Sequence, residues 1–291
     1  MNAQREAAYA KINLYLDVIS RRDDGFHDIA TVMHSVSLAD DITVTLNSLG
    51  TRSVKLVLDG NRRLPTDSKN LAFLAAELFL ERAGIDADVT VKLSKRIPVS
   101  AGLAGGSTDA AATLRAMNKL FRRPFADRAL ASLAESLGSD VPYCLIGGTV
   151  LCEGRGERMT RLSNALKLFT VVAVAREHVS TPVAYSRLDN LYSNFAVKRE
   201  GADRLGKIIA SADLGTLPGD ELYNIFEDAV FPICPGAAEL KQRMLSLGAT
   251  HALMSGSGPS VFGVFKSEKD ARVAEAELSA LGFSAFYAES V

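Results

Sequence analysis

A run of glycines and small hydroxyl residues between Ile97 and Ala111 is the stretch of this sequence best suited to chemistry. It reads Ile-Pro-Val-Ser-Ala-Gly-Leu-Ala-Gly-Gly-Ser-Thr-Asp-Ala-Ala, a short apolar strand, then a loop, then the start of a helix. Glycine lets the backbone approach a ligand closely and adopt positive φ. The free N–H groups and the dipole at a helix start favour an anion. The stretch therefore predicts a loop that holds the phosphates of a nucleotide.

Neither of the two common phosphate-loop patterns describes this stretch. A Walker A loop has Lys directly after its last Gly, whereas Ser107 follows Gly106 here. The dinucleotide fingerprint Gly-x-Gly-x-x-Gly does not fit Gly102, Gly105 and Gly106. A tight strand-to-helix turn without a ligand is the alternative interpretation.

Two charged residues, Lys11 and Asp140, are candidates for handling a reacting hydroxyl. Lys11 lies on an alternating strand, on the face opposite Ile12. There it is either an ordinary solvated lysine or a fixed cation that orients a hydroxyl or neutralises phosphate. Asp140 follows Gly138 in a turn. It either binds its own backbone or accepts a hydroxyl proton.

Two further stretches have the residue types of a binding site. Phe26 and His27 follow a polar turn and offer an aromatic face and an imidazole for recognising a base. A loop histidine beside a core phenylalanine is the alternative. The segment from Ser255 to Ser260 is a second turn of small residues. It is either a simple hairpin or a glycine wall that lines the same cleft.

The composition excludes several classes of protein. The 291 residues carry a net charge of −1, so no overall basic field draws in nucleic acid or an anionic membrane. Three widely spaced cysteines suggest neither a zinc site nor a disulfide framework. The polar N-terminus lacks the apolar core of a signal peptide, and no apolar run is long enough to span a bilayer. We therefore expect a cytoplasmic protein with a small-molecule substrate and neither nucleic acid nor membrane as a partner.

Strands and helices of the predicted fold do not alternate regularly. Residues 9–18, 41–46, 54–58 and 89–93 have the pattern of strands, and residues 70–83, 110–121 and 127–137 that of helices. The chain ends with a β-turn-β-α-β pattern from residue 251 to 288, which suits a split βαβ sheet. The sequence thus predicts an α+β fold in two lobes rather than a doubly wound parallel sheet.

Five motifs, taken in order along the chain, resemble the GHMP kinase superfamily. They are the segments Ala10–Leu14, Asp24–Asp28, Pro98–Ala111, Leu137–Pro142 and Gly256–Gly263. The resemblance covers essentially the whole chain. The resemblance is most specific to the branch of the superfamily that acts on a cytidine diphosphate-linked methylerythritol in the non-mevalonate route to isoprenoids. It implies a ribosomal-S5-domain-2-like N-terminal lobe over residues 1–155 and a ferredoxin-like C-terminal lobe over residues 156–291.

The same resemblance implies an activity and roles for individual residues. The reaction is transfer of the γ-phosphoryl group of ATP to a hydroxyl of the methylerythritol part, with Lys11 and Asp140 as the catalytic pair. Mg²⁺ is implied as well, with Ser107 as its ligand. The residues implied to hold ATP are Pro98, Gly102, Leu103, Ala104, Gly105, Gly106, Ser107 and Thr108, with Lys95 and residues 58–71 near the adenine. Those implied to hold the substrate are Asn13, Phe26, His27, Tyr185, Gly256 and Ser257.

The chain departs from the family pattern at three places, one of which, Ser107-Thr108-Asp109 in place of the commoner Ser-Ser-Asp, keeps the hydroxyls. Phe26 stands where the family often has Tyr, which keeps the stacking face and loses a hydroxyl contact. Asn224-Ile225-Phe226-Glu227 stands where Asn-Asp/Pro-Leu-Glu is common. Two alternative functions are a GHMP kinase for another acceptor, such as phosphomevalonate, homoserine or a sugar, and a non-catalytic nucleotide-binding module. The protein is expected to be a monomer or a homodimer.

Overall fold

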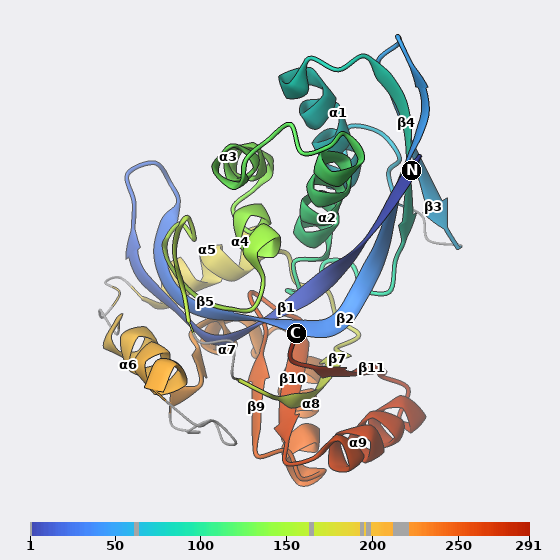
Figure 1. Ribbon diagram of the computed structural model, residues 1–291. Helices are drawn as coiled ribbons and strands as arrows, with labels where there is room; N and C mark the ends of the chain where they lie inside the picture. The colour runs from blue at the N-terminus through green and yellow to red at the C-terminus, as the bar shows by residue number, and fades with distance from the viewer. Residues whose placement is uncertain (1, 61–63, 163–165, 193–194, 196–198, 212–220) are drawn as a thin grey trace. The chain divides into compact units, whose positions relative to one another are not determined.

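Two long strands, β1 (Ala3–Arg21) and β2 (His27–Leu49), each run through both of the compact units that the chain forms (Figure 1). The computed structural model describes residues 2–60, 64–162, 166–192, 195, 199–211 and 221–291. Unit 1 comprises Met1–Ala10, Ala39–Val99 and Ala104–Gly147. Unit 2 comprises Lys11–Leu38, Ser100–Leu103 and Gly148–Val291. The predicted contiguous boundary at residues 155 and 156 stays a prediction.

The sheet of unit 1 has the strand order β3-β4-β2-β1. The strand β3 (Ser53–Asp59) pairs in parallel with β4 (Ala87–Ser94), and β4 pairs antiparallel with β2. Val89, Val91 and Leu93 are buried and alternate with less buried residues along β4. This alternation is the period of a strand with one face on a core.

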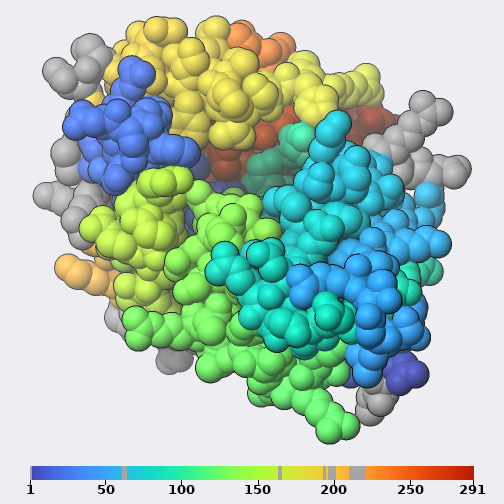
Figure 2. All heavy atoms as spheres, turned by 90° about the horizontal axis from the view of Figure 1, so that it is seen from above, coloured from blue at the N-terminus to red at the C-terminus, as the bar shows by residue number. Residues whose placement is uncertain are grey.

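Four helices of unit 1 pack together beside this sheet. They are α1 (Leu71–Ala83), α2 (Gly105–Leu120), α3 (Asp127–Leu137) and α4 (Val141–Ile146). Asn70 caps the start of α1 with its side chain, and Gly84 ends that helix in a left-handed conformation. The helix α2 packs against α1 and α4, and buried alanines allow the close approach. Figure 2 shows the cyan-to-teal and green residues of this unit side by side on one face.

In unit 2, the continuations of β1 and β2 meet strands from late in the chain. The strand β8 (Tyr223–Asn224) pairs in parallel with β1, with Leu16 opposite Asn224. The strand β5 (Thr149–Gly154) pairs antiparallel with β2 and then with β6 (Arg158–Arg161). These pairings place the second half of β1 beside a segment more than two hundred residues away in sequence.

A second sheet in unit 2 is antiparallel, with the strand order β11-β7-β10-β9. Its strands are β7 (Phe169–Val174), β9 (His251–Met254), β10 (Ser260–Phe265) and β11 (Ser284–Glu289). The helices α8 (Pro235–Ser246) and α9 (Glu268–Ala280) pack on it. The predicted β-turn-β-α-β ending is therefore confirmed as β9, β10, α9 and β11.

The remaining helices of unit 2 are α5 (Thr181–Leu191), α6 (Arg199–Ser211) and α7 (Phe226–Val230). The core of this unit includes Leu16, Val171, Phe226 and Met254. It joins residues from both ends of the sequence. Within the described residues, no helix is long and apolar enough to cross a membrane.

Candidate active site

The glycine-rich stretch changes unit as it passes from loop to helix. Residues 100–103 belong to unit 2, and the chain enters unit 1 at Ala104. The helix α2 begins at Gly105, five residues earlier than the helix expected at 110, so Gly105 to Thr108 form its first turn. The backbone is left-handed at Ser100 (φ 53°), Gly102 (φ 75°) and Ala104 (φ 56°). Residue type does not predict this conformation at Ser100 and Ala104, because both residues have a Cβ atom.

The first turn of α2 presents backbone donors without intrahelical partners. The N–H of Thr108 donates to the carbonyl of Ala104 at 2.9 Å, which is the first such bond of this helix. The N–H groups of Gly105, Gly106 and Ser107 precede it and have no helical acceptor. This geometry suits an anion, as the sequence predicts.

The glycines of unit 1 differ in what surrounds them. A Cβ atom on Gly105 would lie 3.1 Å from Nζ of Lys95, whereas one on Gly106 would meet only Cδ1 of Leu71 at 3.7 Å. Gly105 is thus needed for packing. Gly106 is exposed, and an added Cβ atom there would make only an ordinary contact, so a ligand can reach its backbone.

The hydroxyls of this turn also differ. Thr108 is 1% exposed, and its Oγ1 donates to the carbonyl of Tyr9 at 2.8 Å. Ser107 is half-buried, and its hydroxyl has no partner among the described residues. The side chain of Leu103 belongs to the core, and Pro98 lies in the connection before the turn. Ser107 is therefore the hydroxyl of this turn that can meet a phosphate or a metal ion.

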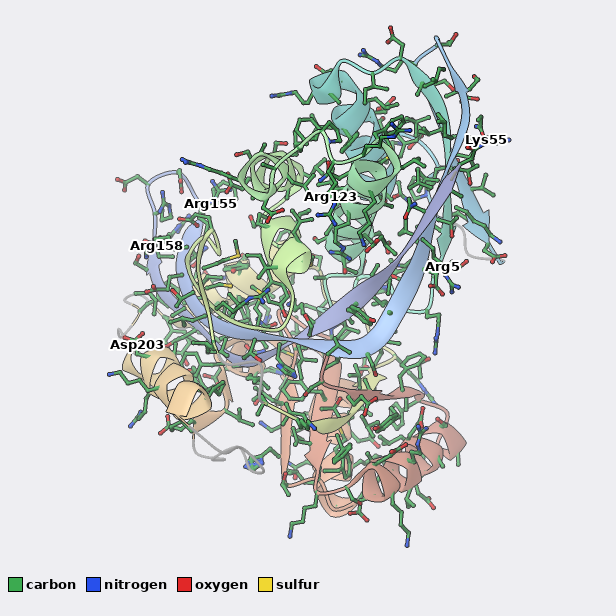
Figure 3. The ribbon with its side chains drawn as sticks, viewed as in Figure 1. Arg5, Lys55, Arg123, Arg155, Arg158 and Asp203 are labelled. Atoms are coloured by element: carbon green, nitrogen blue, oxygen red, sulfur yellow. The ribbon has the colours of Figure 1, made fainter. Side chains whose placement is uncertain are left out.

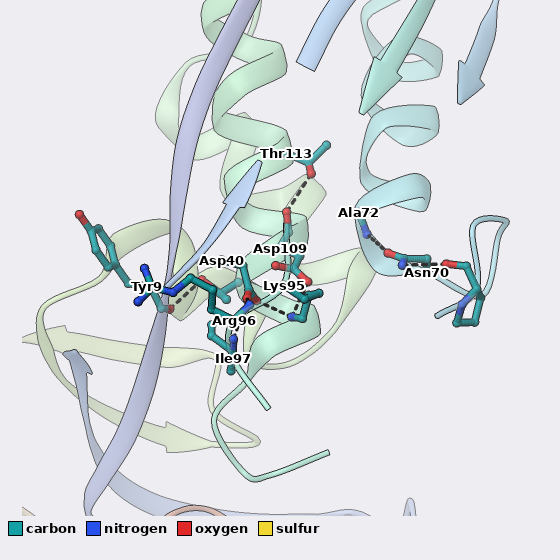
Figure 4. A network of polar contacts seen from close by, with 11 residues as sticks. Tyr9, Asp40, Asn70, Ala72, Lys95, Arg96, Ile97, Asp109 and Thr113 are labelled. Atoms are coloured by element: carbon teal, nitrogen blue, oxygen red, sulfur yellow. Dashed lines mark hydrogen bonds and ion pairs between the residues drawn. The ribbon is translucent and has the colours of Figure 1, made fainter. Parts of the chain in front are cut away.

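Lys95 lies in a buried ion-pair network of unit 1 (Figure 4). Its ammonium contacts a carboxylate oxygen of Asp40 and lies 2.8 Å from Oδ2 of Asp109. Oδ1 of Asp40 also accepts the N–H of Ile97 at 2.8 Å. Burial raises the pKa of Asp109, an effect that the Lys95 ammonium opposes and the Asp40 carboxylate reinforces.

This network ties the first turn of α2 to β2 and to the segment after β4. The Lys95 side chain is 4% exposed, so its ammonium is committed to two carboxylates. Its expected contact with ATP stays a prediction. Of the segment expected near the adenine, residues 61–63 lie outside the described residues.

Lys11 is also buried, but unlike Lys95 it is hydrogen-bonded to an amide oxygen. The residue is 5% exposed, and its Nζ donates to Oδ1 of Asn13 at 2.7 Å. Asn13 in turn donates to Oγ1 of Thr31 at 2.8 Å. Among the described residues of unit 2, none offers Lys11 a carboxylate. A buried ammonium without a counter-ion is unfavourable, so an anionic ligand at Lys11 would be stabilising.

The second turn of small residues, Ser255 to Ser260, lies next to Lys11. Asn13 Oδ1 also accepts the N–H of Gly256 at 3.0 Å. A Cβ atom on Gly256 would lie 3.2 Å from Nζ of Lys11. The Ser257 hydroxyl is hydrogen-bonded to that of Thr181 at 2.9 Å. The structure therefore brings together Lys11, Asn13 and Gly256, which the sequence analysis names separately.

Gly102 faces the same turn from the other side. A Cβ atom there would lie only 2.2 Å from the carbonyl oxygen of Ser255. The Ser255 hydroxyl donates to the Gly102 carbonyl at 3.1 Å, and the Lys11 N–H donates to that of Leu103 at 3.2 Å. Gly102 is thus a glycine because two backbones meet there.

Asp140 directly precedes α4 in unit 1. It is half-buried, its backbone is helical (φ −85°, ψ −14°), and its side chain makes no capping bond. Among the described residues of unit 1, its carboxylate has no partner. It is therefore available to a ligand. Because Lys11 belongs to unit 2, the pairing of these two residues stays a prediction.

The rings expected to bind a base lie in unit 2. His27 is 9% exposed, and its ring centroid lies 4.7 Å from that of Tyr185 with an interplanar angle of 30°. Nε2 of His27 lies 2.7 Å from Oδ1 of Asp189. Phe26 is 51% exposed, and the guanidinium carbon of Arg155 lies 3.8 Å from its ring centroid. Figure 3 labels Arg155 and Arg158 on the hairpin of β5 and β6.

Sequence reasoning missed two supporting residues in this region. Asp189 lies four residues after Tyr185 on α5, so helical spacing placed both on one face. Arg155 lies in a glycine-rich segment that reads as a simple connection, and only the pairing of β2 with β5 brings it to Phe26.

Two family models and many named proteins match this chain. Residues 70–148 match the model for the GHMP kinases N terminal domain, and residues 196–283 match that for GHMP kinases C terminal. A 4-diphosphocytidyl-2-C-methyl-D-erythritol kinase of Caldicellulosiruptor saccharolyticus is 42% identical over 91% of this chain and 89% of that protein. The one of Acetivibrio thermocellus is 38% identical over 98% of both. The chain belongs to the 4-diphosphocytidyl-2-C-methyl-D-erythritol kinase family.

Solved structures agree with membership of this family. A crystal structure of 4-(cytidine 5'-diphospho)-2C-methyl-D-erythritol kinase, 35% identical, superposes with a TM-score of 0.82 over 98% of both chains. A homoserine kinase from Cytophaga hutchinsonii, 22% identical with a TM-score of 0.73 over 100% of this chain and 95% of that one, shares the fold. The expected GHMP kinase fold, α+β in two lobes, and the expected class of ATP-dependent small-molecule kinase are confirmed.

Proposed function

We propose that this protein transfers the γ-phosphoryl group of ATP to the 2-hydroxyl of 4-diphosphocytidyl-2-C-methyl-D-erythritol. The observation that carries the proposal is the match of 38–42% identity, over 91–98% of the chain, to relatives named for this kinase. In the reaction, the hydroxyl oxygen forms a bond to the γ-phosphorus and loses its proton. The bond between the γ-phosphorus and the β–γ bridging oxygen breaks, and ADP leaves.

The phosphates of ATP are proposed to lie at the first turn of α2. The unpartnered N–H groups of Gly105, Gly106 and Ser107 and the helix dipole favour negative charge there. The exposure of Gly106 supports a close approach of the ligand. The left-handed residues Gly102 and Ala104 shape the chain before this turn.

Lys11, Asn13 and Asp140 are proposed to handle the acceptor hydroxyl. Lys11 would attract the hydroxyl oxygen and the transferring phosphoryl group with its charge, and Asn13 fixes its ammonium. Asp140 would accept the proton or hold the hydroxyl in its field. The lack of a carboxylate partner for Lys11 within unit 2 supports this role.

The cytidine end is proposed to be held by Phe26, His27 and Tyr185, with Gly256 and Ser257 lining the site. When Nε2–H of a neutral His27 donates to Asp189, Nδ1 is left as an acceptor. That acceptor suits the exocyclic amino group of cytosine. The exposed ring of Phe26 offers a stacking face.

Mg²⁺ is proposed to enter with ATP and to contact Ser107. Among the described residues, no group of three or more His, Cys, Asp or Glu side chains could hold a metal ion. Mg²⁺ is commonly held by few protein groups together with substrate phosphates. When bound, the ion would neutralise charge on the phosphate oxygens. We further propose that the enzyme works in the cytoplasm as a monomer or homodimer, without nucleic acid.

The test is the release of ADP with each of three acceptors at equal concentration: 4-diphosphocytidyl-2-C-methyl-D-erythritol, phosphomevalonate and homoserine. The proposal predicts turnover of the cytidine compound alone. Turnover of another acceptor in its place would show a different GHMP kinase, and no turnover of any would favour a nucleotide-binding module.

Asp140→Asn checks the assigned mechanism in the same assay. Loss of a proton-handling group lowers kcat by about 10²–10⁴-fold. Asp127→Asn, a change of an exposed residue in the first turn of α3, is the matched control and should leave kcat unchanged. Full turnover by Asp140→Asn would show that the assigned role is wrong.

A further inference from the structure

Asn224 is a buried residue of the late segment to which the sequence analysis gives no role. It is 2% exposed, and its Nδ2 donates to the carbonyls of Met254 at 2.7 Å and of Gly256 at 2.8 Å. Its Oδ1 accepts the N–H of Phe226 at 3.0 Å. The whole side-chain amide is therefore hydrogen-bonded to backbone: one bond holds Gly256 in the small-residue turn, and another holds Met254, the β9 residue just before that turn.

Gly256 lies between two buried amides. On one side its carbonyl accepts from Asn224, and on the other its N–H donates to Oδ1 of Asn13 at 3.0 Å. The same oxygen of Asn13 accepts from Nζ of Lys11 at 2.7 Å. A continuous chain of buried hydrogen bonds thus runs from Asn224 through Gly256 and Asn13 to the Lys11 ammonium.

Glu227 holds the approach to the same turn. Its Oε1 accepts the N–H of Met254 at 2.9 Å, and its Oε2 pairs with Lys241 at 2.5 Å. Asn224 and Glu227 together therefore fix the backbone at Met254 and Gly256. The parallel pairing of β8 with β1 anchors Asn224 on the strand that carries Lys11 and Asn13.

There is little room for this turn to shift without moving Lys11. A Cβ atom on Gly256 would be 3.0 Å from the Gly102 carbonyl oxygen and 3.2 Å from Nζ of Lys11. Because Oδ1 of Asn13 accepts from both the Gly256 N–H and the Lys11 ammonium, a displacement of the turn changes where the ammonium lies. A displacement on the scale of 1 Å can lower a rate by about a hundredfold.

We propose that Asn224 is a positioning residue, which fixes the Gly256 turn and, through Gly256 and Asn13, holds the Lys11 ammonium for the reaction. This rests on the proposed catalytic function of Lys11. The reason for Asn at this position is then specific: it must donate twice to carbonyls and accept once from an N–H, which the Asn side chain does with one amide.

The first experiment needs no substrate. The ¹⁵Nζ–H signal of Lys11, identified by its loss in Lys11→Met, is followed by NMR in wild-type protein, Asn224→Ala and Asn118→Ala. Asn118 is the matched control because it is also buried, at 7% exposed. Its side-chain amide likewise donates to a backbone carbonyl and accepts from a backbone N–H, both of Phe125 in unit 1. We expect the signal to shift or broaden in Asn224→Ala alone. An unchanged signal in Asn224→Ala would overturn the proposal.

Kinetics then separate this inference from the proposed function. With ATP and the cytidine substrate, Asn224→Ala should lower kcat at least about tenfold with little change in either KM. Combined with Lys11→Met, it should lower kcat no further. An equal loss in both backgrounds would show an independent, structural role. A disturbed Lys11 signal with unchanged kcat would instead contradict the catalytic role of Lys11.

A second variant, Asn224→Asp, is used if Asn224→Ala fails to fold. Asn224→Asp keeps the acceptor for the Phe226 N–H and removes the donor to the two carbonyls. If Asn224→Ala does not fold, Asn224→Asp is carried through both measurements, with Asn118→Asp as its control and the same outcomes.

Discussion

Lys11 and Lys95 are both buried lysines, but their surroundings differ. Lys95 is held by the carboxylates of Asp40 and Asp109, whereas Lys11 has only the amide oxygen of Asn13 among the described residues of its unit. Lys95 is thereby part of the framework around the start of α2. The charge of Lys11 is left for a ligand.

The two lysines should respond differently to the same substitution. Lys95→Met leaves two buried carboxylates without their cation and should lower the free energy of unfolding by about 3–5 kcal/mol. Lys11→Met removes an unpaired buried charge, so stability should be kept, while kcat falls by about 10²–10⁴-fold. Urea unfolding followed by circular dichroism, together with ADP release, measures both effects. A stable Lys95→Met or a fully active Lys11→Met would contradict this account.

His34 is a buried residue whose titration should govern stability in acid. Its ring nitrogens lie 2.8 Å from Oγ1 of Thr149 and 2.8 Å from Oγ of Ser290, and burial lowers its pKa from 6.5 to about 4. Between these values the unfolded chain binds a proton that the native protein does not. The free energy of unfolding should therefore fall as the pH falls through this range, by up to roughly 1.4 kcal/mol per pH unit.

Unfolding free energies measured from pH 4 to 7 test this expectation. His34→Gln should flatten the curve in this range, because it removes the group that titrates. The exposed His178 is the matched control, and His178→Gln should keep the wild-type slope. An unchanged slope in His34→Gln would show that other groups cause the acid sensitivity.

At the scale of elements, the glycines of the two small-residue turns serve different purposes. Gly102 and Gly256 are required where backbones meet, and Gly105 is required beside Lys95. Gly106 is exposed, and a Cβ atom there would make only an ordinary contact. A sequence pattern shows only that glycines cluster there. It cannot show which of them meets a ligand and which meets another part of the chain.

Two matched substitutions separate these purposes. Gly106→Ala should leave stability unchanged or raise it by up to about 1 kcal/mol, since Ala favours a helix, while KM for ATP rises about tenfold. Gly102→Ala should lower the free energy of unfolding by about 2 kcal/mol or more, because of the left-handed φ of 75° and the clash with Ser255. An unchanged KM for ATP in Gly106→Ala would exclude a close phosphate at this residue.

Local pattern predicted many of the elements, and its failures have physical causes. The helix over 70–83 is confirmed by α1, with its Asn70 cap and Gly84 end, because these signals are local. The helix predicted from residue 110 begins five residues earlier, at Gly105, since Gly105 and Gly106 have low helix propensity but suit a first turn. The network of Lys95 with Asp40, and the bonds of Asn224 to Gly256, join distant segments and leave no periodic signal.

At the scale of the whole molecule, the chain passes repeatedly between its two units. Leu16 and Val18 from β1 belong to the core of unit 2, together with residues from β7 and α8. Val36 forms a bridge with Ser290 near the end of the chain. Unit 2 therefore depends on residues from the first forty positions.

Separate halves of the chain should not fold. Residues 1–155 hold the β1 segment of unit 2 without its partner β8, and residues 156–291 lack the β1 and β2 segments of that unit. We expect each fragment alone to show neither a cooperative thermal transition nor dispersed amide signals in NMR. Cooperative unfolding of either fragment would instead support an independent domain with a boundary at residue 155.

The central claim is that this molecule phosphorylates one hydroxyl of a cytidine-linked acceptor. The most direct measurement is ³¹P and ¹³C NMR of the product formed from ATP and 4-diphosphocytidyl-2-C-methyl-D-erythritol by the wild-type protein. We predict one new phosphomonoester, coupled to C2 of the methylerythritol part, formed in equal amount to ADP. A phosphoryl group on another oxygen, or ADP released without a phosphorylated product, would contradict the account.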